Sequence, residues 1–407
     1  MNLPKPKNYL KLFLDMDSFF ASVEQQVQPP LRDVPVGIAP YTGATGCIIA
    51  ASKNAKKQGI KVGTSVGEAR KINPRVKILE SRPFLYHLYH KEIVRVLSDF
   101  TPFLRILSID EMAIKLDPIE QNQIEAEKIA VEIKRRICQE VGDFLTCSVG
   151  VGPNHFLAKV AAEAKKPDGI NFVRLDELDK FYSDLELLDL PGINLKMQQA
   201  LNLVGIRSPL EFYQAKDDFL ARFFHWPGRL WYYRLRGYEV DDYKSRTSTI
   251  GHSFVLPPQF RSQAGAKKVI VKLATKVGYR LRQEHFQARS LSLYTRFLDG
   301  HAAREFVSFS PVSDSQTLIR HALNLLAKIN FSQSAPINIF VVAFKLAQTE
   351  RQRSLFSEIQ KASDLSQAMD EINDQFGHDS IYFAETDHDQ SIAPNRIPFG
   401  RPRYEMS

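Results

Sequence analysis

The stretch Leu10-Lys11-Leu12-Phe13-Leu14-Asp15-Met16-Asp17-Ser18-Phe19 joins a strand to the start of a helix. Its leucines and its methionine recur at every second position and form one face of the strand, so Asp15 and Asp17 share the opposite face. Ser18 is a good N-cap residue, and a helix is expected to start there. The stretch therefore predicts a strand whose C-terminal end carries two carboxylates.

A second pair of carboxylates lies at a turn. Two short apolar stretches flank Ser108-Ile109-Asp110-Glu111, which predicts a hairpin over Phe103–Leu116. Carboxylates at strand ends offer a hard cation its preferred oxygen ligands and leave positions for water and phosphate. Two magnesium ions in such a site can clamp the attacking and leaving oxygens of an in-line displacement. Exposed turns often carry acids for structural reasons, and that remains the alternative for each acid taken singly.

The order of the predicted elements indicates the fold class. Helical periodicity over Phe84–Phe100 and Ile124–Val141, followed by a strand over Phe144–Val151, completes a strand–helix–hairpin–helix–strand series. This order predicts an α+β sheet with helices on one face. Residues 171–238 read as short helices, and Leu190–Ile206 looks like a helix–hairpin–helix, whose turn aims backbone N–H groups at a phosphate.

The net charge of +8 is unevenly distributed over the 407 residues. Residues 244–346 hold fifteen Lys and Arg against four Asp and Glu, whereas 347–407 hold six against eleven. Within the basic segment, 249–346 alternate strands and helices, which predicts a second α+β domain with a phosphate-binding surface. A basic domain without a polyanionic partner is the alternative.

Composition excludes several classes of protein. No apolar run reaches the ~18 residues of a membrane span, and Met1–Tyr9 contains no apolar signal core. The three cysteines form neither a disulfide framework nor a metal-ligand pattern. We therefore expect a cytoplasmic protein.

Three separated motifs resemble those of a known family. They are Asp15–Glu24, Ser108–Glu111, and a third group made of Ser148–Val151, Asn154, Ala158–Ala161 and Lys165–Gly169. In this order, over nearly the whole chain, they resemble the motifs of the Y-family translesion DNA polymerases. The resemblance is closest to the DNA polymerase IV (DinB) and UmuC-like bacterial branches, and several matched motifs in order are very specific.

The resemblance implies a multidomain right-hand polymerase. It places a catalytic palm at 1–25 and 80–170, fingers at 26–79, a helical thumb at 171–238, a linker at 239–248, a C-terminal α+β little finger at 249–346 and a tail at 347–407. It also implies a monomer whose partners are primed template DNA, deoxynucleoside triphosphates and a sliding clamp.

The resemblance assigns metal ligands and part of the nucleotide site. Asp15, Asp110 and Glu111 match the catalytic carboxylates that hold two Mg²⁺ ions, and the carbonyl of Met16 matches a further ligand. Phe20, next to Phe19 in the predicted nucleotide site, matches a steric gate that excludes a ribose 2′-hydroxyl. Without the resemblance, Phe20 would be taken for an anchor of its helix.

The predicted triphosphate contacts depart from the family pattern. Lys166 matches a lysine that contacts the incoming triphosphate; a solvated surface lysine is the alternative. In the fingers, Lys53 and Lys56 stand where relatives usually carry Tyr and Arg. The positive charge is kept, but the planar bidentate fork is lost. The helix–hairpin–helix also departs, since Asn194 stands where its second glycine is expected.

Further contacts are predicted in the C-terminal part. Duplex-backbone contacts are expected from basic residues of this part, with Arg246, Lys276, Arg280 and Arg296 as candidates. The tail segment 352–356 resembles the peptide by which bacterial polymerases dock on the sliding clamp, through Gln352, Leu355 and Phe356. An ordinary turn is the alternative for this short motif.

Taken together, the sequence predicts a template-directed DNA polymerase of low fidelity that tolerates damaged bases and lacks proofreading. Two alternatives stay open. One is a catalytically silent relative that serves as a clamp-binding scaffold, which the lysines at 53 and 56 would permit. The other is a different two-metal enzyme on a palm-like sheet, such as a nucleotide cyclase, for which the thumb-like segment and the basic domain have no use.

Overall fold

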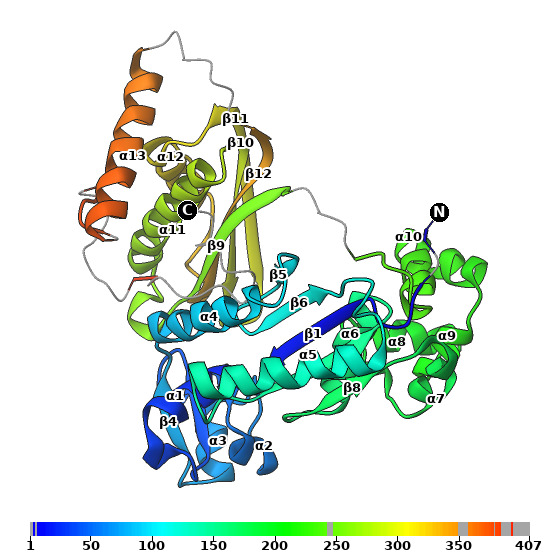
Figure 1. The fold of residues 1–407 in the computed structure, drawn as a ribbon. Coiled ribbons are helices and arrows are strands. Elements are labelled where there is room, and N and C mark those ends of the chain that lie inside the picture. Colours follow the sequence, from blue (N-terminus) through cyan, green and yellow to red (C-terminus); the bar gives the residue numbers. More distant parts are fainter. Residues whose placement is uncertain are drawn as a thin grey trace. The chain divides into compact units, whose positions relative to one another are not determined.

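The computed structural model describes residues 3–4, 6–241, 247–348, 357–377, 379–383 and 392–393, with side chains throughout except at 357–360. These residues form two compact units, one up to 241 and one from 247 onward, and each is described by itself (Figure 1). Both units combine sheets with helices, so the α+β, multidomain prediction is confirmed. In the described part of the chain, no helix is long and apolar enough to cross a membrane.

The first unit contains a five-stranded sheet with β1 at its centre. The strand order is β5 (Leu104–Ile106), β6 (Glu111–Lys115), β1 (Lys11–Met16), β7 (Cys147–Gly152) and β8 (Ile170–Phe172). β1 is antiparallel to both neighbours, and all six of its residues are buried. β5 and β6 form the predicted hairpin.

Helices cover both faces of this sheet. They are α1 (Phe19–Val27), α4 (Pro83–Ser98), α5 (Gln123–Arg136, continued by a π turn at Ile137–Val141) and α6 (His155–Ala164). Leu12 and Leu14 pack in the core formed with α1, α4 and α5, whereas Phe13 packs against Ala158 of α6 on the opposite face. The expectation of helices on one face is therefore wrong. A Cβ on Gly150 would lie 2.0 Å from the Ala158 carbonyl oxygen, so glycine at this position of β7 lets α6 approach the sheet.

A smaller three-stranded sheet lies within 36–80. It contains β3 (Ala50–Ala51), β2 (Val36–Ala39) and β4 (Lys77–Glu80), with helices α2 (Lys53–Lys57) and α3 (Val66–Ile72). Each helix begins at a serine whose hydroxyl accepts a backbone N–H: Ser52 from Ala55, and Ser65 from Glu68. Such caps satisfy N–H groups that a first helical turn leaves unpaired. Ser52 thereby fixes the start of the helix that carries Lys53 and Lys56.

The rest of the first unit is helical, as predicted. Its helices are α7 (Leu178–Ser183), α8 (Leu195–Leu203), α9 (Pro209–Gln214) and α10 (Asp217–Leu235), with short 3-10 turns at Leu175–Glu177 and Leu187–Asp189. Helix α10 is broken at His225, where φ is 53°, two residues before Pro227. Asn194 caps α8 by accepting the Met197 N–H at 3.0 Å, which gives a local reason for an asparagine where glycine is expected.

The second unit is a four-stranded antiparallel sheet with two helices on one face. The strand order is β11 (Ala302–Val312), β10 (Phe286–Phe297), β12 (Pro336–Gln348) and β9 (Thr249–Val255), and the helices are α11 (Gln263–Gln283) and α12 (Ser315–Leu326). Leu291, Leu293 and Val341 point into the core under the helices. The intervening residues point to the other face, so the strand and helix pattern predicted for 249–346 is confirmed.

A long helix packs on the two helices of the second unit. It is α13, which runs from Ser357 to Phe376 and contacts α11 and α12. Asp370 of α13 pairs with Arg282 of α11 at 2.6 Å, and Ser366 accepts the backbone N–H of Ser315 at 3.2 Å. The acidic composition of this segment is thus matched to basic residues of α11, which explains why it folds on the second unit.

Candidate active site

The paired strands β1 and β6 place two predicted ligands side by side. Asp15 and Glu111 are direct cross-strand partners, and the N–H of Met16 donates to the Asp110 carbonyl oxygen at 2.9 Å. Partners in such a register have side chains on the same face of the sheet. Carboxylates nearly 100 residues apart in the sequence therefore meet at one end of the sheet.

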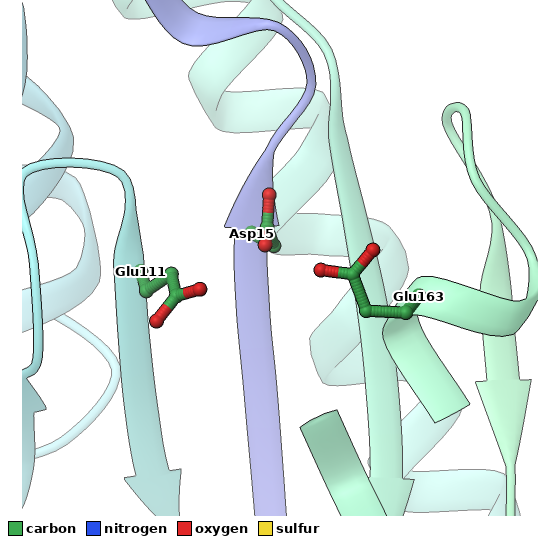
Figure 2. Close-up of side chains that lie close together, drawn as sticks. All are labelled: Asp15, Glu111 and Glu163. Carbon is green, nitrogen blue, oxygen red and sulfur yellow. The ribbon is translucent and has the colours of Figure 1, made fainter. Parts of the chain in front are cut away.

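Asp15 and Glu111 form a group with Glu163, a residue that the sequence analysis missed. One carboxylate oxygen from each of the three lies within 4.8 Å of the others. Figure 2 shows Asp15 at the end of β1 between Glu111 of β6 and Glu163 of α6. Glu163 lies four residues after Lys159, and this spacing puts both side chains on one side of a helix. Since Lys159 belongs to the third motif, this spacing could have pointed to Glu163 as a residue of the site.

Asp110 is turned toward its own hairpin. It is half-buried, and its Oδ1 accepts the Ser108 hydroxyl at 2.6 Å. It is not one of the three carboxylates that meet within 4.8 Å. Its negative charge nevertheless contributes to the raised pKa of Asp15, so the two side chains are electrostatic neighbours.

Two lysines neutralise the carboxylate group. Lys166 lies 2.8 Å from Asp15 and 2.9 Å from Glu163, and Lys159 lies 2.6 Å from Glu111. Buried carboxylates need such partners because desolvation disfavours an isolated charge. The predicted triphosphate lysine, Lys166, thus contacts a predicted metal ligand.

Burial and ion pairing shift the pKa values of Asp15 and Lys166. It raises the pKa of the Asp15 carboxyl to about 7, with Lys166 acting in the opposite direction and Glu163 adding to the rise. For Lys166, burial acts to lower the pKa, but Asp15 and Glu163 outweigh burial and raise it. A carboxylate in a dry site with an adjacent ammonium is typical of a functional site.

Asp17 has a different environment from Asp15. Its carboxylate is 3% exposed and accepts hydrogen bonds from the hydroxyls of Thr146 and Ser148 at 2.7 and 2.8 Å. It also accepts the backbone N–H of Asp168 at 2.8 Å. Both of its oxygens are therefore engaged by protein donors.

The predicted fingers lysines reach the same region. The Lys53 ammonium donates to the Thr146 hydroxyl at 2.7 Å. The pKa of Lys56, one turn later on α2, is lowered by burial and by the charge of Lys166, while Asp17 and Asp15 act in the opposite direction. Lys56 and Lys166 are therefore electrostatic neighbours, and both sense the carboxylates.

Phe20 and Phe19 differ in burial. Phe19 is 2% exposed and belongs to the core, whereas Phe20 is half-buried and stacks on Tyr86, with ring centroids 4.3 Å apart. The Tyr86 hydroxyl donates to Glu24 at 2.8 Å, and Glu24 pairs with Arg82. The ring of Phe20 thus packs on Tyr86, whose own position is held by its hydrogen bond to Glu24.

The remaining predicted contacts are scattered. Arg296 is exposed on β10, one residue after Thr295, which is buried. Lys276 and Arg280 lie on α11, where Lys276 donates to the Ala393 carbonyl at 2.5 Å and Arg280 donates to the Gly251 carbonyl at 3.0 Å. Four predicted contacts lie outside the described residues: Arg246, Gln352, Leu355 and Phe356.

The group of carboxylates fits a divalent metal. All three members offer oxygen ligands, which hard cations such as Mg²⁺ prefer. Two of the three are intermediate in burial or exposed, so the group opens toward solvent on one side.

Comparisons with known proteins agree with this geometry. Residues 14–163 match the model of the impB/mucB/samB family, and 247–355 match the C-terminal domain of the same family. A DNA polymerase IV of Moorella thermoacetica is 30% identical over 381 residues, which cover 92% of this chain and 95% of that protein. The chain belongs to the impB/mucB/samB family.

Other members and solved structures support the assignment. A DNA polymerase IV of Bacteroides fragilis is 27% identical over 79% of this chain and 88% of its own length. A Y-family DNA polymerase chimera of Dbh and Dpo4 covers 84% of this chain and all of the chimera, with a TM-score of 0.72 and 21% identity. An insertion ternary complex of Dbh DNA polymerase covers the same shares, with a TM-score of 0.55 and 21% identity. The resemblance to Y-family polymerases is thereby confirmed.

Proposed function

We propose that this chain is a template-directed DNA polymerase that transfers a nucleotide from a deoxynucleoside triphosphate to a primer 3′-hydroxyl. The observation that carries this proposal is the pairing of Asp15 with Glu111 at adjacent strand ends, with Lys166 at 2.8 Å from Asp15. Family membership selects this reaction among those that a carboxylate-rich metal site supports. Damage tolerance, low fidelity and the absence of proofreading follow from the same membership.

Asp15, Asp110, Glu111 and the Met16 carbonyl would hold two Mg²⁺ ions. Asp110 would exchange its Ser108 hydrogen bond for this role. When bound, the ions would supply Lewis-acid activation of the 3′-hydroxyl and charge neutralisation on the phosphates. Glu163 pairs with Lys166 and is a neighbour of the site rather than a ligand in this proposal.

Residues around the carboxylates would bind and select the nucleotide. Lys166 and Lys56 would hold the triphosphate, since two adjacent ammonium groups suit a polyanion. Phe20, with Phe19 buried behind it, would exclude a ribose 2′-hydroxyl because Tyr86 supports its ring.

The domain boundaries given above from the sequence are part of the proposal. Arg296 on the exposed sheet face is the best-placed candidate for a backbone contact to duplex DNA, whereas Lys276 and Arg280 of α11 donate to the carbonyls of Ala393 and Gly251. Docking on a sliding clamp, a monomeric state and action in the cytoplasm complete the proposal.

Primer extension tests the function. The purified chain would be given a primed template, deoxynucleotides and Mg²⁺, beside a variant with Asp110→Ala and Glu111→Ala. Extension by the chain that is lost in the variant supports the polymerase, and a template with an abasic site tests damage tolerance.

Other outcomes favour the alternatives. Clamp binding without extension in either protein would support the silent scaffold. Release of pyrophosphate from a nucleoside triphosphate in the absence of primer would instead indicate a cyclase-like enzyme.

A further inference from the structure

The buried carboxylate of Asp17 accepts three hydrogen bonds from two separate segments of the chain. The hydroxyls of Thr146, just before β7, and of Ser148 in β7 are two of the donors, and the N–H of Asp168 in the loop after α6 is the third. At 3% exposure, these donors offset its desolvation. Asp17 therefore holds two segments together instead of offering oxygens to solvent or to a ligand.

Thr146 connects Asp17 to Lys53 of helix α2, because its hydroxyl makes a hydrogen bond to each of them. A hydroxyl has a single hydrogen, and that of Thr146 is directed at Asp17, 2.7 Å away. The lone pairs of the same oxygen are then available to the Lys53 ammonium, also 2.7 Å away. The direction of both hydrogen bonds is fixed, because an ammonium donates and a carboxylate accepts.

The loop that carries Lys166 is held from both sides. On one side Asp17 accepts the N–H of Asp168. On the other side Lys134 of α5 donates to the carbonyls of Cys147 and Asp168 at 2.9 and 2.5 Å, and to the Asp168 carboxylate at 2.6 Å. Lys166, two residues before Asp168, is thus anchored to β7, to α5 and, through Thr146, to α2.

We propose that Asp17 and Thr146 form a relay that couples helix α2 to the Lys166 loop, and that Lys53 is a positioning residue of this relay rather than a triphosphate ligand. Lys56, three residues after Lys53, is then held at a set distance from Lys166. The charge of Lys166 contributes to the lowered pKa of Lys56, after burial, so the two side chains already act on each other electrostatically. This inference rests on the proposed function for its catalytic consequence, namely nucleotide affinity.

Single-turnover incorporation on a primed template separates the two roles of Lys53. In the relay, Thr146→Val and Lys53→Met each raise the apparent Kd for the incoming nucleotide, by roughly tenfold for a lost charge-assisted hydrogen bond, with the maximal rate little changed. Thr146→Ser, which keeps the hydroxyl, restores the affinity. The double variant is no worse than the poorer single variant, because both substitutions break one chain of contacts.

A direct triphosphate ligand gives a different result. Thr146→Val would then free the Lys53 ammonium and leave the affinity unchanged or improved, while Lys53→Met alone would weaken binding. That outcome would overturn the relay. Lys57→Met, on the exposed side of the same helix, is the matched control and leaves the affinity unchanged.

Amine labelling gives a readout that does not depend on catalysis. With an amine-reactive reagent and mass spectrometry, Thr146→Val is expected to increase the modification rate of Lys53 about threefold or more while leaving Lys57 unaffected, because a hydrogen-bonded ammonium is less available. An unchanged rate at Lys53 would refute the relay. If the unmodified chain failed to extend primers, the proposed function would be lost, and the labelling result would still decide whether the relay exists.

Discussion

The two principal sheets of this molecule use charge in opposite ways. In the first unit, helices cover both faces of the five-stranded sheet, and Asp15 is 5% exposed at a strand end with Lys166 at 2.8 Å. In the second unit, helices cover one face of the four-stranded sheet, and Arg296 is exposed on a strand. Charges in a dry site act strongly at short range, whereas exposed charges are screened within ~8–10 Å at moderate salt. The first sheet therefore suits chemistry, and the second suits salt-dependent contact with a polyanion.

The largest expected effect is at the first sheet. Glu111→Gln keeps the size of the side chain and an acceptor for Lys159 but removes the charge. We expect the rate of nucleotide incorporation to fall on the order of 10³-fold, as for other losses of preorganised charge stabilisation. Single-turnover kinetics would measure this fall.

The affinity for primed DNA supplies the control for Glu111→Gln. It should remain within about twofold, because the loss affects chemistry and not backbone contact. A wild-type rate of incorporation by this variant would contradict the conclusion that the charges of the first sheet serve chemistry.

A somewhat smaller effect is expected at Phe20. Phe20→Ala removes the ring that stacks on Tyr86, so the ratio of kcat/KM for deoxynucleotides over ribonucleotides should fall on the order of 100-fold. Tyr86→Phe keeps the ring and loses only the hydroxyl bond to Glu24, so it should keep most of the discrimination. Unaltered discrimination in Phe20→Ala would show that another group selects the sugar.

The raised pKa of Asp15 predicts opposite pH effects on stability and on metal affinity. Because the folded pKa, about 7, exceeds the ordinary value of 3.8, the metal-free fold is most stable below the ordinary value and loses this contribution as pH rises through about 7. A metal competes with the proton, so the half-saturating Mg²⁺ concentration should fall about tenfold per pH unit from pH 5.5 to 6.5 and level off above 7.

Two titrations check the Asp15 prediction. Thermal unfolding in a chelator is measured across this pH range for the wild-type chain and for Asp15→Asn, whose stability should lack the corresponding loss. Metal-dependent incorporation is measured on the wild-type chain. A half-saturating Mg²⁺ concentration that does not change with pH would contradict the assigned ionisation.

Much of the fold was predictable because periodicity reports burial. The alternation in Leu10–Phe19 predicted β1, and the motif Ser108–Glu111 predicted the hairpin of β5 and β6. The expectation of one-sided helices failed because alternation shows which residues are buried but not which element covers them. Phe13 is covered by α6, which comes about 140 residues later in the chain.

The candidate site was only partly predictable for a similar reason. Asp15 and Asp17 are indistinguishable by pattern, since both are acids on the same strand face. The structure separates them through partners that are distant in sequence: Lys166 for Asp15, and Thr146 and Ser148 for Asp17. Such partners can be assigned only after the strands and loops have been placed in space.

A modest effect is expected at the second sheet. Arg296→Ala should weaken duplex DNA binding severalfold at physiological salt and reduce the slope of log K against log salt by about 1, because one phosphate contact is lost. Lys328→Ala, an exposed lysine after α12, is the matched control and should leave the slope unchanged. Fluorescence anisotropy at several salt concentrations measures both, and an unaltered slope in Arg296→Ala would remove this residue from the proposed contact.

The smallest expected effect is at helix α2, which carries Lys56. Lys56 is a point charge whose pKa is lowered by burial and by the charge of Lys166, at a position where the family resemblance leads us to expect an arginine. Lys56→Arg restores a planar fork that can bind a phosphate through two parallel hydrogen bonds, and its charge does not depend on a lowered pKa. The KM for the incoming nucleotide should therefore fall by roughly two- to fivefold, within the range of one improved phosphate contact. Lys57→Arg, one residue farther along the helix, should leave KM unchanged. An unaltered KM in Lys56→Arg would mean that Lys166 and the carboxylate-bound metal suffice to bind the triphosphate. The charges that bind the nucleotide in the first unit would then lie at the strand ends of its five-stranded sheet and not on helix α2.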